Sequence, residues 1–413
     1  MRTLALALAD EAQRFVKGYP PKGSWLFMRP NHDISRLAGA LTGEDVLTYV
    51  DERCEPLKWS GDEDLCLVHV GFGDEHESAR IAGRLRGSGI EPVFFGPQAT
   101  AWDDAAPNWV HRHVIGDLLL AWPQLRRDSA EQTPRSIYRA PRTPEYFPAS
   151  RSIGRAPQMN ARDQTIAFRL GCACPNTARR WCPSYLYHGD ETRLRERDEV
   201  IGEVLTLPGK HIDLLDDDVA SEPEYYFELF RHLWNYRRLW KVRASDKLFQ
   251  YPWLIRLLAK AGTRIVFLDE SFLGDRIEEA TRDERLGRAL YRRIKFLQSR
   301  RMLVGARIML DLELPHDYRA ITRLLRRIDL DFLELRCTVR NREGKKALQP
   351  TRYRPMLSSD DPAWIRNSFY NLSSIGNRAA RRPRRVGFYT TVRYLLPYSL
   401  SYRQNLLEGL PYP

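Results

Sequence analysis

The sequence has no long hydrophobic run. No window approaches the ~18 to 20 consecutive apolar residues that a membrane-spanning helix needs. The apolar stretch at residues 4–9 ends at Asp10 and Glu11, and it is too short for the apolar region of a secretory signal. We therefore expect no membrane span, no signal peptide and a cytoplasmic protein. In that compartment the six cysteines are expected to be thiols rather than disulfides.

Common hydrolase signatures are also lacking. The sequence contains no phosphate-binding loop with its lysine, no zincin helix and no Ser/His/Asp order. Gly71-Phe72-Gly73 follows a strand-like run, but it lacks the third glycine of a dinucleotide-binding fingerprint and is followed by two acidic residues. Hydrolase activity and a phosphate cradle therefore have no support in the sequence.

The length of the chain and its net charge limit the number of domains and the kinds of partner. A chain of 413 residues with 43% hydrophobic residues is expected to form two domains plus an extension. Its 65 Lys and Arg against 53 Asp and Glu give a net charge of +12. That excess indicates either an anionic partner or a solvated basic surface. The segment 377–385 holds five arginines and is interpreted as a charged surface loop, with an anion-binding arm as the alternative.

Short apolar runs alternate with a helical pattern in the first part of the chain. Strands that alternate with helices favour a parallel, doubly wound α/β sheet. We predict such a domain over residues 1–130, followed by a linker over 131–164 that is rich in Pro, Ser and Arg. The predicted strands are 24–28, 46–50, 65–70, 93–95 and 114–115, and the predicted helix is 74–86.

A second region in which predicted strands alternate with predicted helices covers residues 165–340. A basic, aromatic extension follows over 341–413. Six strands alternating with five helices indicate a partial (β/α)6 barrel. Chemistry in such a barrel lies at the carboxyl ends of the strands. The predicted strands are 166–170, 212–215, 239–242, 264–268, 306–310 and 332–335, and the helices are 197–207, 224–236, 253–261, 286–298 and 318–328.

Three of the six cysteines, Cys172, Cys174 and Cys182, lie within eleven residues after the first of these strands. Three thiolates suit an iron–sulfur cluster or zinc. A structural zinc normally takes four protein ligands, and His188 is the nearest candidate for the fourth. The alternative is that the cysteines are small buried residues of a turn.

The cysteine segment and its surroundings resemble the cobalamin-binding type of radical S-adenosylmethionine protein. The matching elements occur in the family's order over roughly residues 24–340. They are Arg169, Gly171-Cys172, Trp181-Cys182, Arg193-Leu194-Arg195, Val200-Ile201-Gly202-Glu203, Asp216-Asp217-Asp218, Asp269-Glu270-Ser271, Phe95-Gly96-Pro97-Gln98-Ala99-Thr100 and Gly116-Asp117.

This resemblance implies a cobalamin-binding-like Rossmann domain, a radical-SAM-type barrel and a set of ligands. Cys172, Cys174 and Cys182 would hold a [4Fe-4S] cluster that binds and cleaves S-adenosylmethionine, although their Cys-x-Cys-x7-Cys spacing departs from the family's CxxxCxxC. The loop that supplies a lower histidine to cobalamin is missing, and His76 lies near its place without the spacing. Cobalamin binding is therefore left open.

Four further residues are implied as ligands of the cofactor. Asp217 and Asp218 would bind the ammonium or ribose of S-adenosylmethionine, Glu270 the ribose hydroxyls, and Arg243 a carboxylate. Each acidic residue has an alternative as a helix cap or first-turn acid.

The function implied by the resemblance is radical chemistry on an unidentified small molecule, either methyl transfer or oxidative cyclisation. An electron donor such as flavodoxin or ferredoxin would serve it. Two alternatives come from other classes. One is a descendant without a cluster that binds a ligand or partner, and the other is an RNA-binding or RNA-modifying protein, suggested by the net charge of +12.

Overall fold

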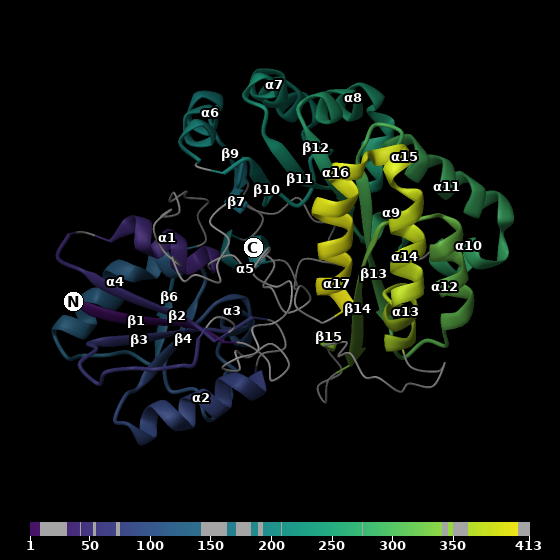
Figure 1. The fold of residues 1–413 in the computed structure, drawn as a ribbon. Helices are drawn as coiled ribbons and strands as arrows, with labels where there is room; N and C mark the ends of the chain where they lie inside the picture. The colour runs from purple at the N-terminus through teal and green to yellow at the C-terminus, as the bar shows by residue number, and fades with distance from the viewer. Residues whose placement is uncertain are drawn as a thin grey trace. The chain divides into compact units, whose positions relative to one another are not determined.

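The computed structural model describes residues 1–8, 31–41, 43–52, 55–71, 75–141, 163–170, 183–188, 193–207, 209–274, 276–340, 346–349 and 362–403. The chain forms two compact units (Figure 1). Unit 1 comprises Met1–Ala161, Arg169–Arg195 and Gly409–Pro413, and unit 2 comprises Arg162–Phe168 and Glu196–Glu408. In the described part of the chain, no helix has the length and apolar character needed to cross a membrane.

Unit 1 is built on a six-stranded parallel sheet, as its alternating pattern predicted. The strand order is β2-β1-β3-β4-β5-β6, so the order reverses between β1 and β3, where doubly wound folds bind their ligands. The strands are β1 (Arg2–Ala7), β2 (Val46–Asp51), β3 (Leu65–His69), β4 (Pro92–Phe95), β5 (His113–Ile115) and β6 (Ile137–Arg139).

Four predicted strands of this domain are confirmed, and the fifth, at 24–28, lies outside the described residues. Two strands were not predicted. β1 comes from the apolar stretch at the start of the chain, which was considered only as a signal segment, and it lies inside the sheet. β6 lies within 131–164, the range predicted as a linker, and pairs with β5.

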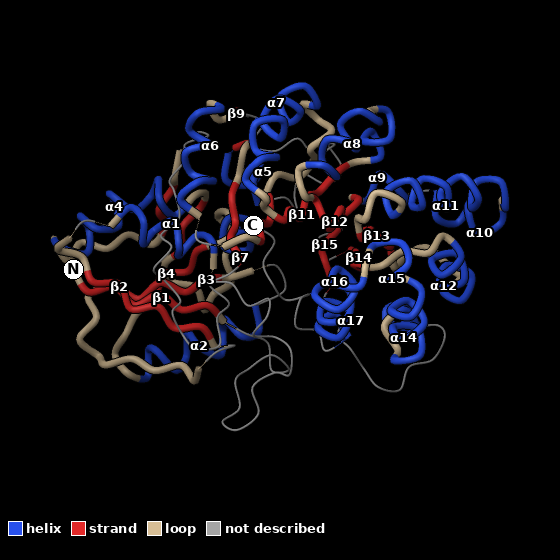
Figure 2. The backbone as a smooth tube through the Cα atoms, turned by 45° about the horizontal axis from the view of Figure 1, so that its top comes forward, coloured by secondary structure: helices blue, strands red, loops and turns tan. Residues whose placement is uncertain are grey.

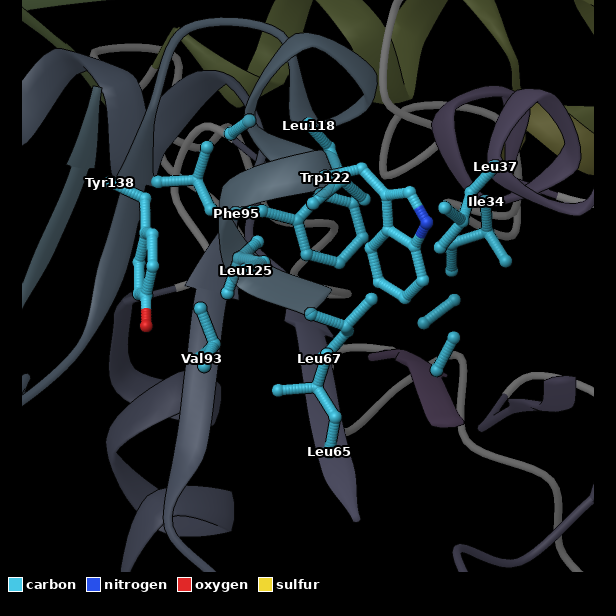
Figure 3. Close-up of a cluster of buried hydrophobic side chains, with 14 residues drawn as sticks. Ile34, Leu37, Leu65, Leu67, Val93, Phe95, Leu118, Trp122, Leu125 and Tyr138 are labelled. Carbon is cyan, nitrogen blue, oxygen red and sulfur yellow. The ribbon is translucent and has the colours of Figure 1, made fainter. Parts of the chain in front are cut away.

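Helices α1 (His32–Ala40), α2 (Glu75–Gly87), α3 (Pro97–Trp102) and α4 (Leu118–Ala130) complete this sheet. Successive residues of β3 enter different cores: Leu65 and Leu67 belong to the cluster around Trp122 (Figure 3), and Cys66 and Val68 to a second cluster. Both faces of the sheet are therefore buried, which explains why its strands consist of continuous apolar runs.

The segment Arg169–Arg195 returns to unit 1. Within it β8 (Arg169–Leu170) pairs antiparallel with β9 (Arg193–Leu194), and α5 (Pro183–His188) packs against α3. The strand predicted at 166–170 is thus divided: β7 (Asp163–Ile166) belongs to unit 2 and β8 to unit 1.

Unit 2 contains a seven-stranded sheet of order β15-β14-β13-β12-β11-β10-β7. The six strands other than β15 are parallel, so the predicted open (β/α) half-barrel is confirmed. Besides β7 they are β10 (His211–Leu214), β11 (Leu239–Ala244), β12 (Thr263–Leu268), β13 (Leu303–Asp311), β14 (Phe332–Arg340) and β15 (Lys346–Gln349).

Helices follow the strands and cover the outer face of this sheet (Figure 2). Trp240 of β11 shows the packing, because its ring meets Phe168 and Phe230 of α7 edge to face. The elements are α6 (Arg197–Thr206), α7 (Pro223–Leu233), η3 (Trp234–Tyr236), η4 (Asp246–Gln250), α8 (Pro252–Lys260), α9 (Glu270–Leu273), α10 (Arg276–Arg282), α11 (Glu284–Gln298) and α12 (Tyr318–Arg327).

The C-terminal segment, predicted as an extension over 341–413, packs on the half-barrel. Tyr398 lies against Phe332 and Lys241, on the opposite face of the sheet from α7. Figures 1 and 2 show α16 and α17 beside the sheet strands. The helices of the C-terminal segment are α13 (Ala363–Phe369), α14 (Leu372–Arg381), α15 (Pro383–Val386), α16 (Phe388–Thr390), the π-helix η5 (Thr391–Leu395) and α17 (Leu396–Arg403).

The arginine-rich segment 377–385, expected to be a charged surface loop, lies in α14 and α15, so the expectation of a loop was wrong, and two of its arginines are buried. Arg378 is buried over the ring of Phe369, and Arg382 is buried between the carboxylates of Asp329 and Asp331. The other three arginines of the segment, Arg381, Arg384 and Arg385, are exposed.

Candidate functional site

The inner face of the half-barrel, on which Tyr398 lies, carries a row of charged side chains. Because strand register alternates faces, Asp213, Lys241, Arg307 and Glu334 share this side of neighbouring strands. Charges on buried strands are costly unless they are paired. Lys241 Nζ meets Asp213 Oδ2 at 2.9 Å, and the guanidinium of Arg307 faces Glu334 at 3.3 Å.

The aspartates after β10 have different surroundings. Asp216 is buried and accepts from the Phe168 N–H at 2.8 Å and from the Tyr226 hydroxyl at 2.6 Å. Asp218 Oδ1 accepts from the N–H groups of Ala220 and Ser245, both at 2.8 Å. Both carboxylates therefore accept hydrogen bonds from backbone N–H groups. Asp217, which lies between them in the sequence, is half-buried.

Arg243, predicted to meet a carboxylate, is buried near the carboxyl end of β11. Its Nη1 donates to the Leu214 carbonyl at 2.9 Å and lies 3.9 Å from Asp213 Oδ1. In the structure the carboxylate beside Arg243 thus belongs to the protein itself.

Asp269 and Glu270 follow β12 at the same edge. Asp269 caps α9, since its Oδ1 accepts from the Ser271 N–H at 3.0 Å. Burial raises the pKa of Asp269 to about 7, and the neighbouring carboxylates of Glu270 and Asp218 add to the effect against the hydrogen bonds from Ser271. Close to neutral pH this carboxyl can therefore hold or release a proton.

Glu270 is one end of a row that crosses three strands. Arg307 Nη1 lies 3.5 Å from Glu270 Oε2, and Arg307 Nε lies 3.3 Å from Glu334 Oε2. Arg336 Nη2 donates to Glu334 Oε1 at 3.0 Å. We call Glu270, Arg307, Glu334 and Arg336 the charge ladder.

Sequence reasoning found Glu270 and missed the other three members of the ladder. A signal was present: in the predicted strands, Arg307 and Glu334 interrupt otherwise apolar runs. Their pairing depends on the register Arg307↔Glu334, which the strands acquire only in the sheet.

The predicted cluster ligands Cys172, Cys174 and Cys182 lie outside the described residues. The described residues nearest to these cysteines belong to β8, which ends at Leu170 and pairs with β9, and to α5, which begins at Pro183. Among the residues that the structure places, no three His, Cys, Asp or Glu side chains are grouped to hold a metal ion.

At the carboxyl edge of the unit 1 sheet, two motifs of the sequence meet. The Thr100 hydroxyl donates to the Gly96 carbonyl at 3.0 Å and accepts from the Gly116 N–H at 3.1 Å. Gly96 has φ +110°, and a Cβ there would come within 2.8 Å of the Val70 carbonyl oxygen. Only glycine allows the turn to press so closely on the end of β3.

Beside this turn lies a buried polar network. Arg36 Nη2 donates to Asp117 Oδ2 at 2.7 Å, and its Nη1 lies 3.8 Å from Asp33 Oδ1. Asp33 Oδ2 accepts from the Tyr187 hydroxyl at 2.9 Å and lies 3.9 Å from His69 Nε2. No sequence pattern indicated this network, because its members come from four separate segments.

Comparisons with known proteins agree with this architecture. No protein-family model matches the chain. The radical S-adenosylmethionine methyltransferase TsrM from Kitasatospora setae, solved with cobalamin and a [4Fe-4S] cluster, superposes with a TM-score of 0.54 at 14% identity over 82% of this chain and 75% of that one. The cobalamin-dependent S-adenosylmethionine radical enzyme OxsB gives a TM-score of 0.51 at 12% identity over 78% and 52%. The chain has the fold of cobalamin-dependent radical S-adenosylmethionine enzymes.

A curated relative points the same way. The bacteriochlorophyllide d C-12(1)-methyltransferase of Chlorobaculum tepidum is 22% identical over 293 residues, which cover 64% of this chain. The match spans 64% of that methyltransferase as well, which is less than two thirds of its length. The predicted radical-SAM-type fold, with a Rossmann-like domain and a partial barrel, is confirmed.

The resemblance to the cobalamin-binding type assigns cobalamin to the carboxyl edge of unit 1. Gly96 and Gly116 are both buried there, and the Gly96 carbonyl and the Gly116 N–H bond to the Thr100 hydroxyl. His76, considered as a cobalt ligand, is exposed and lies 3.6 Å from Glu77.

Proposed function

We propose that this protein is a radical S-adenosylmethionine enzyme that transfers a methyl group to a small molecule. The observation that carries the proposal is the gathering of three carboxylates, Asp218, Asp269 and Glu270, at the carboxyl edge of a half-barrel with this fold, the last of them paired with Arg307. Methyl transfer is preferred over oxidative cyclisation because TsrM and the curated relative are both named methyltransferases.

In this proposal Cys172, Cys174 and Cys182 hold the [4Fe-4S] cluster. Reduced by a flavodoxin or ferredoxin, the cluster would supply the electron for cleavage of S-adenosylmethionine, and cobalamin on the turn from Gly96 to Thr100 would supply a carrier for the methyl group. The chain's part is to bind and orient these groups and to exclude water.

The residues at the carboxyl edge of the half-barrel sheet are proposed to bind S-adenosylmethionine. Asp217 and Asp218 face its ammonium or ribose, and Glu270 accepts from the ribose hydroxyls. Arg243 shares the carboxylate of Asp213 with Lys241, and its guanidinium is proposed to meet a carboxylate of the bound molecule. Asp269, with a pKa of about 7, is proposed to exchange a proton with a bound molecule near neutral pH.

The deciding experiment is an iron count after anaerobic reconstitution with iron and sulfide. We expect about four irons per chain, lost when Cys172, Cys174 or Cys182 is replaced by Ala. The control is Cys66→Ala, since Cys66 is a free, buried cysteine of β3. The reconstituted protein is then assayed for S-adenosylmethionine cleavage under reducing conditions.

Absence of iron in the wild-type protein would overturn the proposal. It would leave a protein of the second class, one that binds a ligand or partner without a cluster. The paired charges of the half-barrel do not require iron and would serve such binding as well.

A further inference from the structure

The charge ladder gives Arg307 a specific geometry. Its guanidinium bridges two carboxylates, with Nε facing Glu334 Oε2 and Nη1 facing Glu270 Oε2. Glu334 is held in turn, because its other oxygen accepts from Nε and Nη2 of Arg336 at 3.2 and 3.0 Å. The four side chains thus alternate in charge from the end of β12 to β14.

Limited exposure makes this bridge rigid. The side chains of Arg307 and Glu334 are 15% and 10% exposed, whereas that of Glu270 is 24% exposed. Arg307 also lies directly opposite Glu334 in the register of β13 and β14. Because a guanidinium is planar, fixing one of its edges on Glu334 fixes the direction of the remaining N–H groups.

Glu270 is more exposed than Arg307 and Glu334. It is the first residue of α9, a helix of four residues, and lies next to the strand end rather than within a strand. In the part of the chain that the structure describes, its Oε2 meets Arg307 and no hydrogen bond to its Oε1 is found. A carboxylate held through one oxygen presents the other in a defined direction.

We propose that Arg307 is a positioning residue that fixes the Glu270 carboxylate for recognition of the ribose hydroxyls of S-adenosylmethionine. This inference rests on the proposed function, since it needs the adenosyl ligand. Arg307 itself touches no ligand. It acts by restricting Glu270, so the loss of Arg307 and the loss of Glu270 remove the same selectivity.

The test compares ligands within each variant. Binding of S-adenosylmethionine and of its 2′-deoxy and 3′-deoxy analogues is measured by anaerobic titration calorimetry on the reconstituted, unreduced protein. The ratio of dissociation constants is unaffected by a fraction of inactive protein. We expect the wild type to prefer the natural ribose over at least one analogue by about tenfold or more, as for a lost hydrogen bond to a charged group.

Arg307→Met is expected to lower that preference to the level of Glu270→Gln, and the double variant to lower it no further. Arg307→Lys, which keeps a charge without the planar fork, is expected to restore part of it. The matched control is Arg336→Met, which removes an arginine of the same ladder that contacts Glu334 and not Glu270. It is expected to keep most of the preference.

The outcomes separate the two proposals. If the wild type binds no S-adenosylmethionine, the proposed function and this inference both fall. If it binds with ribose preference and Arg307→Met keeps that preference, or if the losses in the double variant add, the inference alone is overturned. A wild type that binds without ribose preference also overturns it.

Discussion

The hydroxyl of Tyr187 donates a hydrogen bond of 2.9 Å to the carboxylate of Asp33, from a position 154 residues further along the chain. Tyr187 lies on α5, directly after the cysteine segment, and Asp33 lies in the first turn of α1. Tyr187 is 6% exposed. The contact therefore holds α5 to α1 within unit 1.

Asp33 makes unit 1 sensitive to pH. Burial raises its pKa from 3.8 to about 6, with Asp117 adding to the effect and Arg36 and the Tyr187 hydrogen bond opposing it. Between these values the folded protein keeps a proton that the unfolded chain has released. The stability contributed by this carboxyl is therefore complete below pH 3.8 and is lost as the pH rises through about 6.

We predict that Asp33→Asn gains stability relative to wild type between pH 4 and pH 7, by up to about 3 kcal/mol, since one pKa unit corresponds to about 1.4 kcal/mol. Chemical denaturation at a series of pH values measures it, with Asp62→Asn as an exposed control. The variant keeps the other ionisable groups that face Asp33, which are Arg36, His69, Asp117 and Tyr187. A difference from wild type that does not vary with pH would contradict the assignment.

Gly305 permits an aromatic stack across three strands. Phe267 of β12 and Phe332 of β14 stack with ring centroids 6.0 Å apart, and Gly305 lies between them on β13. A Cβ on Gly305 would come within 2.6 Å of the Phe267 ring. We predict that Gly305→Ala destabilises unit 2 by about 1–3 kcal/mol, measured by denaturant unfolding.

The control for this change is Gly376→Ala in α14, where a Cβ would meet nothing within 4 Å. It is expected to be neutral or to stabilise by up to about 1 kcal/mol, because alanine favours the helix. Equal effects of the two substitutions would show that the Phe267 contact does not matter.

Arg382 anchors the C-terminal helices. Its Nη2 and Nη1 donate to Asp329 at 2.9 and 3.0 Å, and its Nε donates to Asp331, a fully buried carboxylate. We predict that Arg382→Met costs about 3–5 kcal/mol because it leaves the buried carboxylate of Asp331 without its cation, whereas Asp329 keeps Lys295 and Arg385. The exposed Arg384→Met serves as the control, and a similar small effect in both would refute the anchor.

Thr100 links the two motifs at the edge of unit 1. Thr100→Val keeps the shape of the side chain but leaves the buried Gly116 N–H without its acceptor. The expected cost is about 1–3 kcal/mol, together with faster amide hydrogen exchange at Gly116. Thr133→Val, at an exposed position, is the control. Unchanged exchange at Gly116 in Thr100→Val would argue against the link.

Much of the architecture follows from local sequence. The strands of both units are rich in apolar residues, and the helices have apolar residues at helical spacing, so the order of elements and the fold class were predictable. The order of motifs around Cys172, Thr100 and Glu270 was enough to indicate the kind of fold. These features depend on neighbours in the chain, which is why the sequence alone determined them.

Other features arose only in the tertiary structure. Whether Arg307 meets Glu334 depends on strand register, and whether Arg382 is solvated or buried depends on the carboxylates of Asp329 and Asp331, about 50 residues earlier. The place of β1 inside its sheet and the contact of Tyr187 with Asp33 likewise join distant segments. A charged side chain has the same sequence pattern on a surface and in a buried pair, so only the packed structure distinguished the two.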